Sequence, residues 1–177
     1  MKIETATIRR LRDALLESGR RASTVMSPAY ETLARAGMLS DDERTALSRV
    51  DSMAETLFLM MAADGKVTDS ERDALRGAIR GLAGDVLHPG TINVMLEHYE
   101  RALSSEGREA RLRALGAMLS NIPAAAEGAF ALAAAVALAD GEVADEERAL
   151  VDQIREWFGI TVDRASVILH QLDDDKE

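Results

Sequence analysis

Apolar residues recur at three- and four-residue spacing along most of this chain, which is the period of an α-helix with one buried face. The longest pattern spans residues 41–63, and its last turn is apolar on every side, as is typical of a helix at the centre of a fold. Residues 123–139 are almost entirely Ala, Leu and Val, so we expect neighbouring helices to cover them all round. No stretch shows a sustained period of two, and the sequence therefore predicts an all-α fold.

The same spacing predicts shorter helices between turn signals. They contain residues 3–17, 28–37, 69–82, 91–103, 112–119, 150–158 and 161–172. Thr91 and Thr161 each precede an apolar pattern at the position of a helix N-cap, so we expect both to cap the helices that follow. Residues 173–177, DDDKE, have the composition of a solvated acidic tail.

One ten-residue segment occurs twice. Residues 63–72 read ADGKVTDSER and residues 139–148 read ADGEVADEER, so Ala, Asp, Gly, Val, Asp, Glu and Arg recur at identical offsets. Each copy predicts a helix end, a turn at glycine and a new helix, because glycine tolerates the positive φ that follows many helix C-termini. Residues 36–44, AGMLSDDER, are a degenerate third copy. We therefore expect a multi-helix bundle with two pseudo-twofold-related helix-turn-helix repeats, connected by the third copy.

Two of the three copies contain a capping box. Ser40 with Glu43, and Thr68 with Glu71, have the spacing in which the hydroxyl accepts from the N3 amide while Glu accepts from the cap amide. The remaining copy has Ala144 at the cap position, so its cap must be weaker or must shift to Asp145.

Composition and charge exclude several classes of function. The formal net charge of −10 and the pI of about 4.8 argue against a nucleic-acid binder, which would need clustered Lys and Arg. The absence of cysteine excludes disulfides, thiolate nucleophiles and iron–sulfur clusters, and fits a cytoplasmic protein. The start lacks an apolar leader region, and the longest apolar run, residues 129–139, is too short for a transmembrane segment.

The repeated acids suggest a metal site shared by the two copies. In the numbering of a calcium loop, Asp64 takes position 5 and Glu71 position 12, but the first half of the loop is apolar, which excludes a complete EF-hand. If the two turns face one another, Asp64, Glu71, Asp140 and Glu147 can form an all-oxygen site for Ca²⁺, Mg²⁺ or Mn²⁺. Asp145 adds negative charge to the second copy and is a further candidate ligand.

A structural role is the alternative. An Asp at a helix C-terminus faces the negative end of the helix dipole, and hydrogen bonds from the turn amides after glycine would compensate it. Glu71 and Glu147 can likewise serve only as cap residues. Both interpretations stay open at this point.

Enzyme chemistry lacks its usual patterns. The three histidines, His88, His98 and His170, lie in no zinc-hydrolase or di-iron spacing. The sequence also contains no phosphate-binding loop and no Gly-x-Ser-x-Gly nucleophile turn. We therefore expect a protein that is not an enzyme.

The motif Ala-Asp-Gly-x-Val-x-x-x-Glu-Arg, present twice after apolar helices, resembles that of the TerB-like tellurite-resistance family over about residues 51–170. The resemblance implies an all-helical fold and a non-enzymatic role in tellurite or general stress resistance. It also implies divalent-metal binding by acidic residues and protein partners, some of them at the inner membrane. The matching acids are Asp64 and Glu71 in one copy, and Asp140 and Glu147 in the other.

The predicted organisation has three parts. Residues 1–40 form an N-terminal helical extension that is packed on or linked to the core, residues 41–172 a TerB-like domain, and residues 173–177 the acidic tail. The sequence supports two hypotheses of function. The first is a protein that binds a divalent cation at its repeated turns. The second is a helical protein–protein interaction module whose acidic residues only cap helices and form salt bridges. The sequence makes no prediction of homo-oligomeric state.

Overall fold

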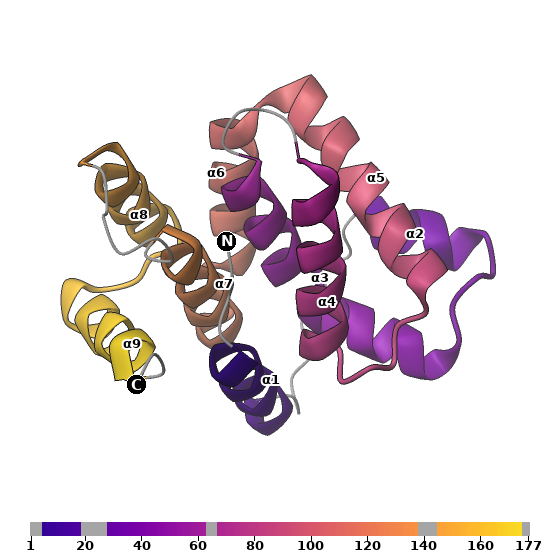
Figure 1. Cartoon of the computed structure of the whole chain (residues 1–177), viewed down its shortest axis with the longest axis horizontal. Helices are drawn as coiled ribbons and strands as arrows, with labels where there is room; N and C mark the ends of the chain where they lie inside the picture. The colour runs from indigo at the N-terminus through magenta and orange to yellow at the C-terminus, as the bar shows by residue number, and fades with distance from the viewer. Residues whose placement is uncertain (1–4, 19–27, 63–66, 138–144, 175–177) are drawn as a thin grey trace.

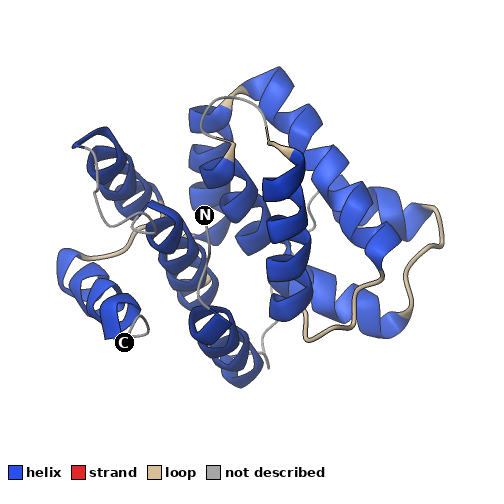
Figure 2. Ribbon diagram, in the orientation of Figure 1, coloured by secondary structure: helices blue, strands red, loops and turns tan. Residues whose placement is uncertain are grey.

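A computed structural model describes residues 5–18, 28–62, 67–137 and 145–174. All regular secondary structure within these ranges is helical, which confirms the predicted all-α fold (Figure 2). The helices are α1 (Thr5–Ser18), α2 (Pro28–Arg35), α3 (Asp41–Met61), α4 (Asp69–Leu82), α5 (Pro89–Glu106), α6 (Arg108–Leu119), α7 (Pro123–Ala137), α8 (Asp145–Trp157) and α9 (Val162–Asp174). The pseudo-twofold relation between the two repeats stays a prediction.

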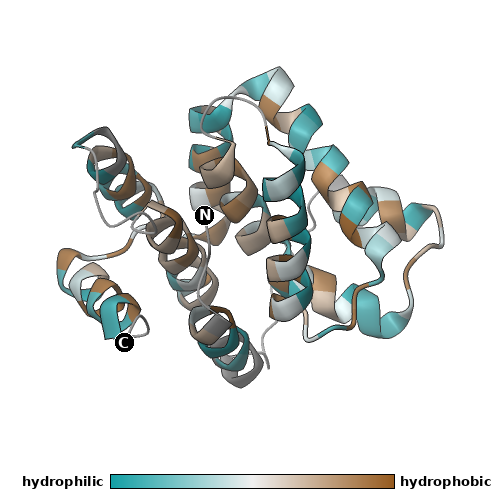
Figure 3. Ribbon diagram, in the orientation of Figure 1, coloured by the Kyte–Doolittle hydropathy of each residue, from teal (hydrophilic) through white to brown (hydrophobic). Residues whose placement is uncertain are grey.

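Helices α3 and α7 form the centre of the molecule. They pack along one another, and each carries a long run of buried residues. Helices α2, α4, α5 and α6 surround α3, whereas α1, α8 and α9 contact α7 (Figure 1). Hydrophobic residues follow α7 along its length, while α4 turns hydrophilic residues outward (Figure 3). The helix whose last turn is apolar on every side and the helix built almost entirely of Ala, Leu and Val are therefore the central helices, as their patterns predicted.

Glycine allows two of the helix pairs to approach closely. A Cβ atom at Gly128 of α7 would lie 2.8 Å from Cε of Met53 on α3. At Gly116 of α6 it would lie 2.4 Å from the carbonyl oxygen of Trp157 on α8. The second contact is with backbone, which cannot rotate aside as a methionine side chain can, so Gly116 fixes the distance between α6 and α8.

The first two helices pack on the rest of the chain. Helix α1 lies against α4 and α7, and its Ile8 and Leu11 are buried. Arg10 of α1 also donates from Nη1 to the carbonyl oxygen of Gln171 in α9, at 2.9 Å. Helix α2 lies against α3 and α5 through Leu33. The division of the chain at residue 40 remains a prediction, since neither of these contacts defines a domain boundary.

Several helix ends differ from the sequence prediction. Helix α5 begins at Pro89, with His88 as its N-cap, so Thr91 lies inside the first turn and does not cap the helix. Proline is favoured there because its fixed φ suits a first helical residue and its missing N–H costs no hydrogen bond. Thr161 does cap α9, accepting the amide of Arg164 at 3.2 Å. Helix α9 runs to Asp174, two residues into the predicted tail.

Candidate functional site

The acidic corner between α3 and α4 contains the predicted capping box. Thr68 is the N-cap of α4, and its hydroxyl oxygen accepts the amide of Glu71 at 3.3 Å. In return, Oε2 of Glu71 accepts both the amide and the hydroxyl of Thr68 at 2.8 Å. These hydrogen bonds lower the pKa of Glu71. The other carboxylate oxygen of Glu71, Oε1, accepts no hydrogen bond from the described residues.

The capping box at the start of α3 has the same local geometry, but its glutamate also contacts a second helix. Oε2 of Glu43 accepts the amide and hydroxyl of Ser40 at 3.1 and 3.0 Å. Its Oε1 accepts the amide of His88 at 3.2 Å and the hydroxyl of Thr91 at 3.0 Å, both at the start of α5. Glu43 therefore joins the N-termini of two helices.

Glu43 is charged in spite of its burial. Only 4% of the residue is exposed, and burial raises its pKa because it disfavours the charged form. The four hydrogen bonds from Ser40, His88 and Thr91 outweigh that effect and lower the pKa to about 2. The carboxylate is thus ionised at neutral pH and depends on these donors.

The predicted metal ligands are only partly described. Asp64 and Asp140 lie outside the described residues, as does the side chain of Glu147, whose backbone belongs to α8. Asp145 is the exposed first residue of α8. Among the residues that the structure does describe, no three acidic or histidine side chains are grouped so as to hold a metal ion. The shared site for Ca²⁺, Mg²⁺ or Mn²⁺ stays a prediction.

A buried polar network crosses the middle of the molecule. Asp51 and Glu55 lie one turn apart on α3, and both are almost fully buried. Oδ1 of Asp51 accepts the hydroxyl of Tyr99 on α5 at 2.6 Å. Oε1 of Glu55 accepts a hydrogen bond from Nε of Arg111 on α6 at 2.8 Å, and Nη2 of Arg111 lies 2.7 Å from the same oxygen in an ion pair. Arg111 also pairs with Glu106 at the end of α5, so the network connects three helices.

Burial changes the acidity of this network. It raises the pKa of Glu55 to about 7, against the opposing effect of Arg111, and nearby Asp51 and Glu106 raise it further. Burial followed by the charge of Asp51 raises the pKa of Tyr99 well above its usual value. Asp51, Glu55 and Tyr99 are buried, and their hydrogen bonds supply the partners that burial of polar groups requires.

A family model described as tellurite resistance protein TerB matches residues 50–170, more than half of the chain. The chain belongs to the TerB family. The match begins within α3, ends within α9 and includes both acidic segments, which confirms the resemblance expected from the repeated motif. Helices α1 and α2 precede the region that matches TerB. Comparison with curated proteins and with solved structures gives no match.

Sequence reasoning missed the buried network of this TerB protein. A signal was present, because Asp51 and Glu55 interrupt the apolar pattern of the central helix at a spacing of one turn. Charged residues at such positions need a partner, since burying an unpaired charge is costly. Their partners, Tyr99 and Arg111, carried no comparable signal. Within the described ranges, none of the helices is both long and apolar enough to cross a membrane.

Proposed function

We propose that this TerB-family protein is a non-catalytic protein of the tellurite-resistance or general stress-resistance type. It acts in the cytoplasm by associating with protein partners, some of which are held at the membrane. Family membership supports this proposal, together with the absence of catalytic patterns from the sequence. The helical bundle then serves as an interaction module, and its acidic residues cap helices and form salt bridges.

The observation that carries this proposal is the environment of Glu71. This residue is a repeated acid of the family motif whose side chain is described, and its Oε2 is occupied by two hydrogen bonds from Thr68. The next motif residue, Arg72, pairs with Glu100 of α5. Both side chains therefore have structural partners, and neither contact needs a ligand.

Divalent-cation binding is the second candidate function. It is favoured by Oε1 of Glu71, which accepts no hydrogen bond from the described residues, and by the exposure of Asp145. The proposed ligands are Asp64, Glu71, Asp140 and Glu147, with Asp145 beside them. Carboxylate oxygens suit Ca²⁺, Mg²⁺ and Mn²⁺, which are hard cations.

Calorimetric titration with CaCl₂ and then MnCl₂ separates the two candidates. An interaction module gives no saturable heat from the native protein. A cation-binding protein gives saturable heat that is lost in the double variant Asp140→Asn with Glu147→Gln. A matched control is Asp152→Asn with Glu156→Gln, which removes two acids of α8 outside the motif and must leave any cation heat unchanged.

A survival assay tests the proposed role in resistance. Cells from which the protein has been deleted are compared with the same cells carrying the native chain, at increasing concentrations of tellurite and of an unrelated oxidant. We expect the native chain to restore survival under at least one of the two stresses. Equal survival with and without the protein under both stresses would contradict the proposal.

A further inference from the structure

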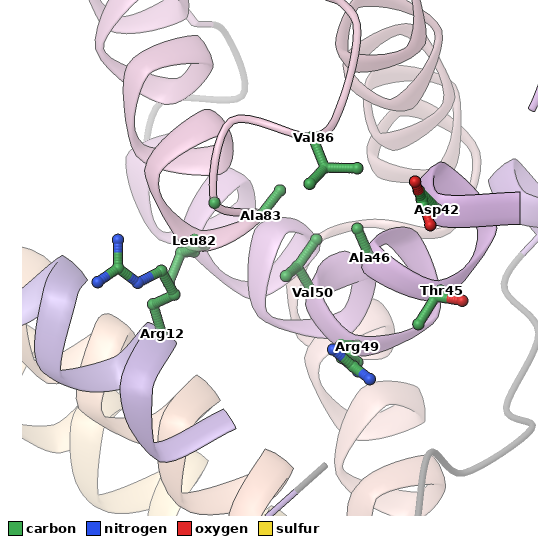
Figure 4. A pocket seen from close by; sticks show the side chains of 10 residues that line it. Arg12, Asp42, Thr45, Ala46, Arg49, Val50, Leu82, Ala83 and Val86 are labelled. Carbon is green, nitrogen blue, oxygen red and sulfur yellow. The ribbon is translucent and has the colours of Figure 1, made fainter. Parts of the chain in front are cut away.

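A hollow of about 340 Å³ lies between the start of α3, the end of α4 and helix α1 (Figure 4). Its volume is within the range of small-ligand sites in proteins. The apolar part of its lining comes from Ala46, Val50, Leu82, Ala83 and Val86. Val86 is 41% exposed and contributes an accessible apolar side chain to this lining. The hollow therefore offers hydrophobic surface that the described residues do not cover.

Two arginines also line the hollow. Arg12 comes from α1 and Arg49 from α3, and the acidic lining residue is Asp42 at the start of α3 (Figure 4). Nε of Arg49 is shielded from solvent and has no hydrogen-bond partner among the described residues. Arg12 pairs with its neighbour Asp13, whose side chain is 60% exposed, and such surface pairs are weak.

The state of Arg49 indicates what the hollow can bind. Several arginines of this chain are held by carboxylates, Arg111 and Arg164 among them. Arg49 forms no ion pair with a described residue, so it can turn its guanidinium toward an anion without losing an existing contact. A guanidinium presents a planar fork of donors that matches the two oxygens of a carboxylate. The apolar residues of the lining suit a ligand whose remaining part is hydrocarbon.

We propose that this hollow binds a small aliphatic carboxylate, with the carboxylate on Arg49 and the hydrocarbon chain against Val50, Leu82 and Val86. Arg12 adds positive charge at the α1 side of the hollow. The residues that line the hollow lie outside the two full copies of the repeated segment, and the proposal does not depend on cation binding or on the role in resistance.

Octanoate is the probe that tests this site, with octan-1-ol and octylammonium as controls of equal chain length. Binding to the full chain is followed by calorimetry and by the shifts of backbone amide signals in NMR spectra. We expect saturable binding of one octanoate, with the largest shifts at Ala46, Ala83 and Val86. Octan-1-ol should bind at least tenfold more weakly, and octylammonium should not bind detectably.

Two pairs of variants test the assigned contacts. Arg49→Gln should weaken octanoate binding at least tenfold, whereas Arg44→Gln, which removes the same charge from an exposed position of α3, should change it less than twofold. Val86→Glu should abolish binding by placing a carboxylate at the hollow. Val167→Glu is its matched control on α9, at a similarly exposed valine, and should leave binding unchanged.

Three outcomes would overturn the proposal. The first is no saturable binding of octanoate by the native chain. The second is equal binding of octanoate and octan-1-ol, or an Arg49→Gln variant that binds octanoate as well as the native chain does. Either result would mean that the carboxylate does not contribute to binding. The third is a native dimer in sedimentation analysis that Val86→Glu dissociates, since a second copy would then occupy this surface. Thermal melting of each variant verifies that it is folded.

Discussion

The same capping box starts α3 and α4, yet the two glutamates differ in what else they hold. One carboxylate oxygen of Glu71 accepts hydrogen bonds from its own N-cap residue, and Glu71 remains partly exposed. Glu43 makes the same hydrogen bonds and is buried. Its second carboxylate oxygen accepts hydrogen bonds from the amide of His88 and the hydroxyl of Thr91. One local motif thus serves two purposes, since the box of Glu71 stabilises a single helix and the box of Glu43 fixes one helix against another.

This difference bears on the proposed function. A carboxylate whose two oxygens are both engaged and buried has no capacity for a ligand, whereas Oε1 of Glu71 accepts no hydrogen bond from the described residues. If the TerB motif only caps helices, both glutamates should influence stability and neither should respond to cations. If the motif binds a cation, Glu71 alone should respond. Variants at the two boxes therefore test whether the two glutamates differ in this way.

The largest effect is expected for Glu43→Ala. This change removes an ionised, buried carboxylate and leaves four hydrogen-bond donors without an acceptor, among them the hydroxyl of the buried Thr91. We therefore expect it to lower the free energy of unfolding by about 3 kcal/mol. Glu71→Ala should cost only about 1 kcal/mol, as is usual for the loss of a helix cap. Urea unfolding followed by circular dichroism measures both. Equal losses in the two variants would mean that the bond to α5 contributes nothing.

Low pH should remove the stabilisation that Glu43 supplies, because the pKa of this residue is lowered in the folded protein. Because the folded-state pKa of about 2 lies below the ordinary value of 4.5, the contribution of Glu43 is full above pH 4.5 and is lost as the pH falls toward 2. We expect the stability difference between the native chain and Glu43→Gln to shrink across this window. The test is the melting midpoint of both proteins from pH 6 to pH 2, and a difference that stays constant would contradict the lowered pKa.

Thr91→Val removes one of the two hydrogen bonds between Glu43 of α3 and the start of α5, while it conserves the shape of the side chain. It leaves Oε1 of Glu43 with one donor instead of two, so we expect a loss of about 1 to 2 kcal/mol. Thr45→Val is a control on the exposed side of α3 and should cost less than half as much. Chemical denaturation gives both values. If Thr91→Val is as stable as the native chain, the hydroxyl does not support Glu43.

The smallest effect is expected for Thr68→Ala, at about 1 kcal/mol or less. Thr68 is exposed, and the hydrogen bonds of its side chain to described residues lie within its own helix N-terminus. Replacement by Ser should restore most of the loss, since a serine hydroxyl also caps helices. Differential scanning calorimetry of the native chain and both variants checks this order. A Ser variant as unstable as the Ala variant would assign the effect to the lost methyl group instead of the hydroxyl.

The sequence predicted the elements of the fold better than the contacts between them. Capping boxes and helix periodicity are local signals, so the start of α4 at Asp69 was predicted correctly. The start of α5 was not, because the helix begins at Pro89 and the hydroxyl of Thr91 bonds to Glu43, which is distant in the sequence. For the same reason the spacing between Ser40 and Glu43 identified the box but gave no sign that the carboxylate is buried.

The candidate site shows the same limit. The repeated acids were identified from their offsets, but whether they share a cation depends on how two corners of the fold approach one another, which no local pattern encodes. The buried pair of Glu55 and Arg111 was missed because its members lie on different helices. The sequence shows only that Glu55 lies within an apolar stripe. This position predicts that Glu55 needs a partner, but it does not identify the partner.

The melting midpoint in the presence and absence of Ca²⁺ tests most directly whether the TerB motif of this chain is structural. A cation that binds only the folded state must raise the midpoint with concentration. Because we propose that Glu71 only caps α4, we expect millimolar CaCl₂, compared with EDTA at equal ionic strength, to leave the midpoints of the native chain and of Glu71→Gln unchanged. A rise in the native chain that grows with CaCl₂ and is absent from Glu71→Gln would contradict the structural role and would establish the cation site.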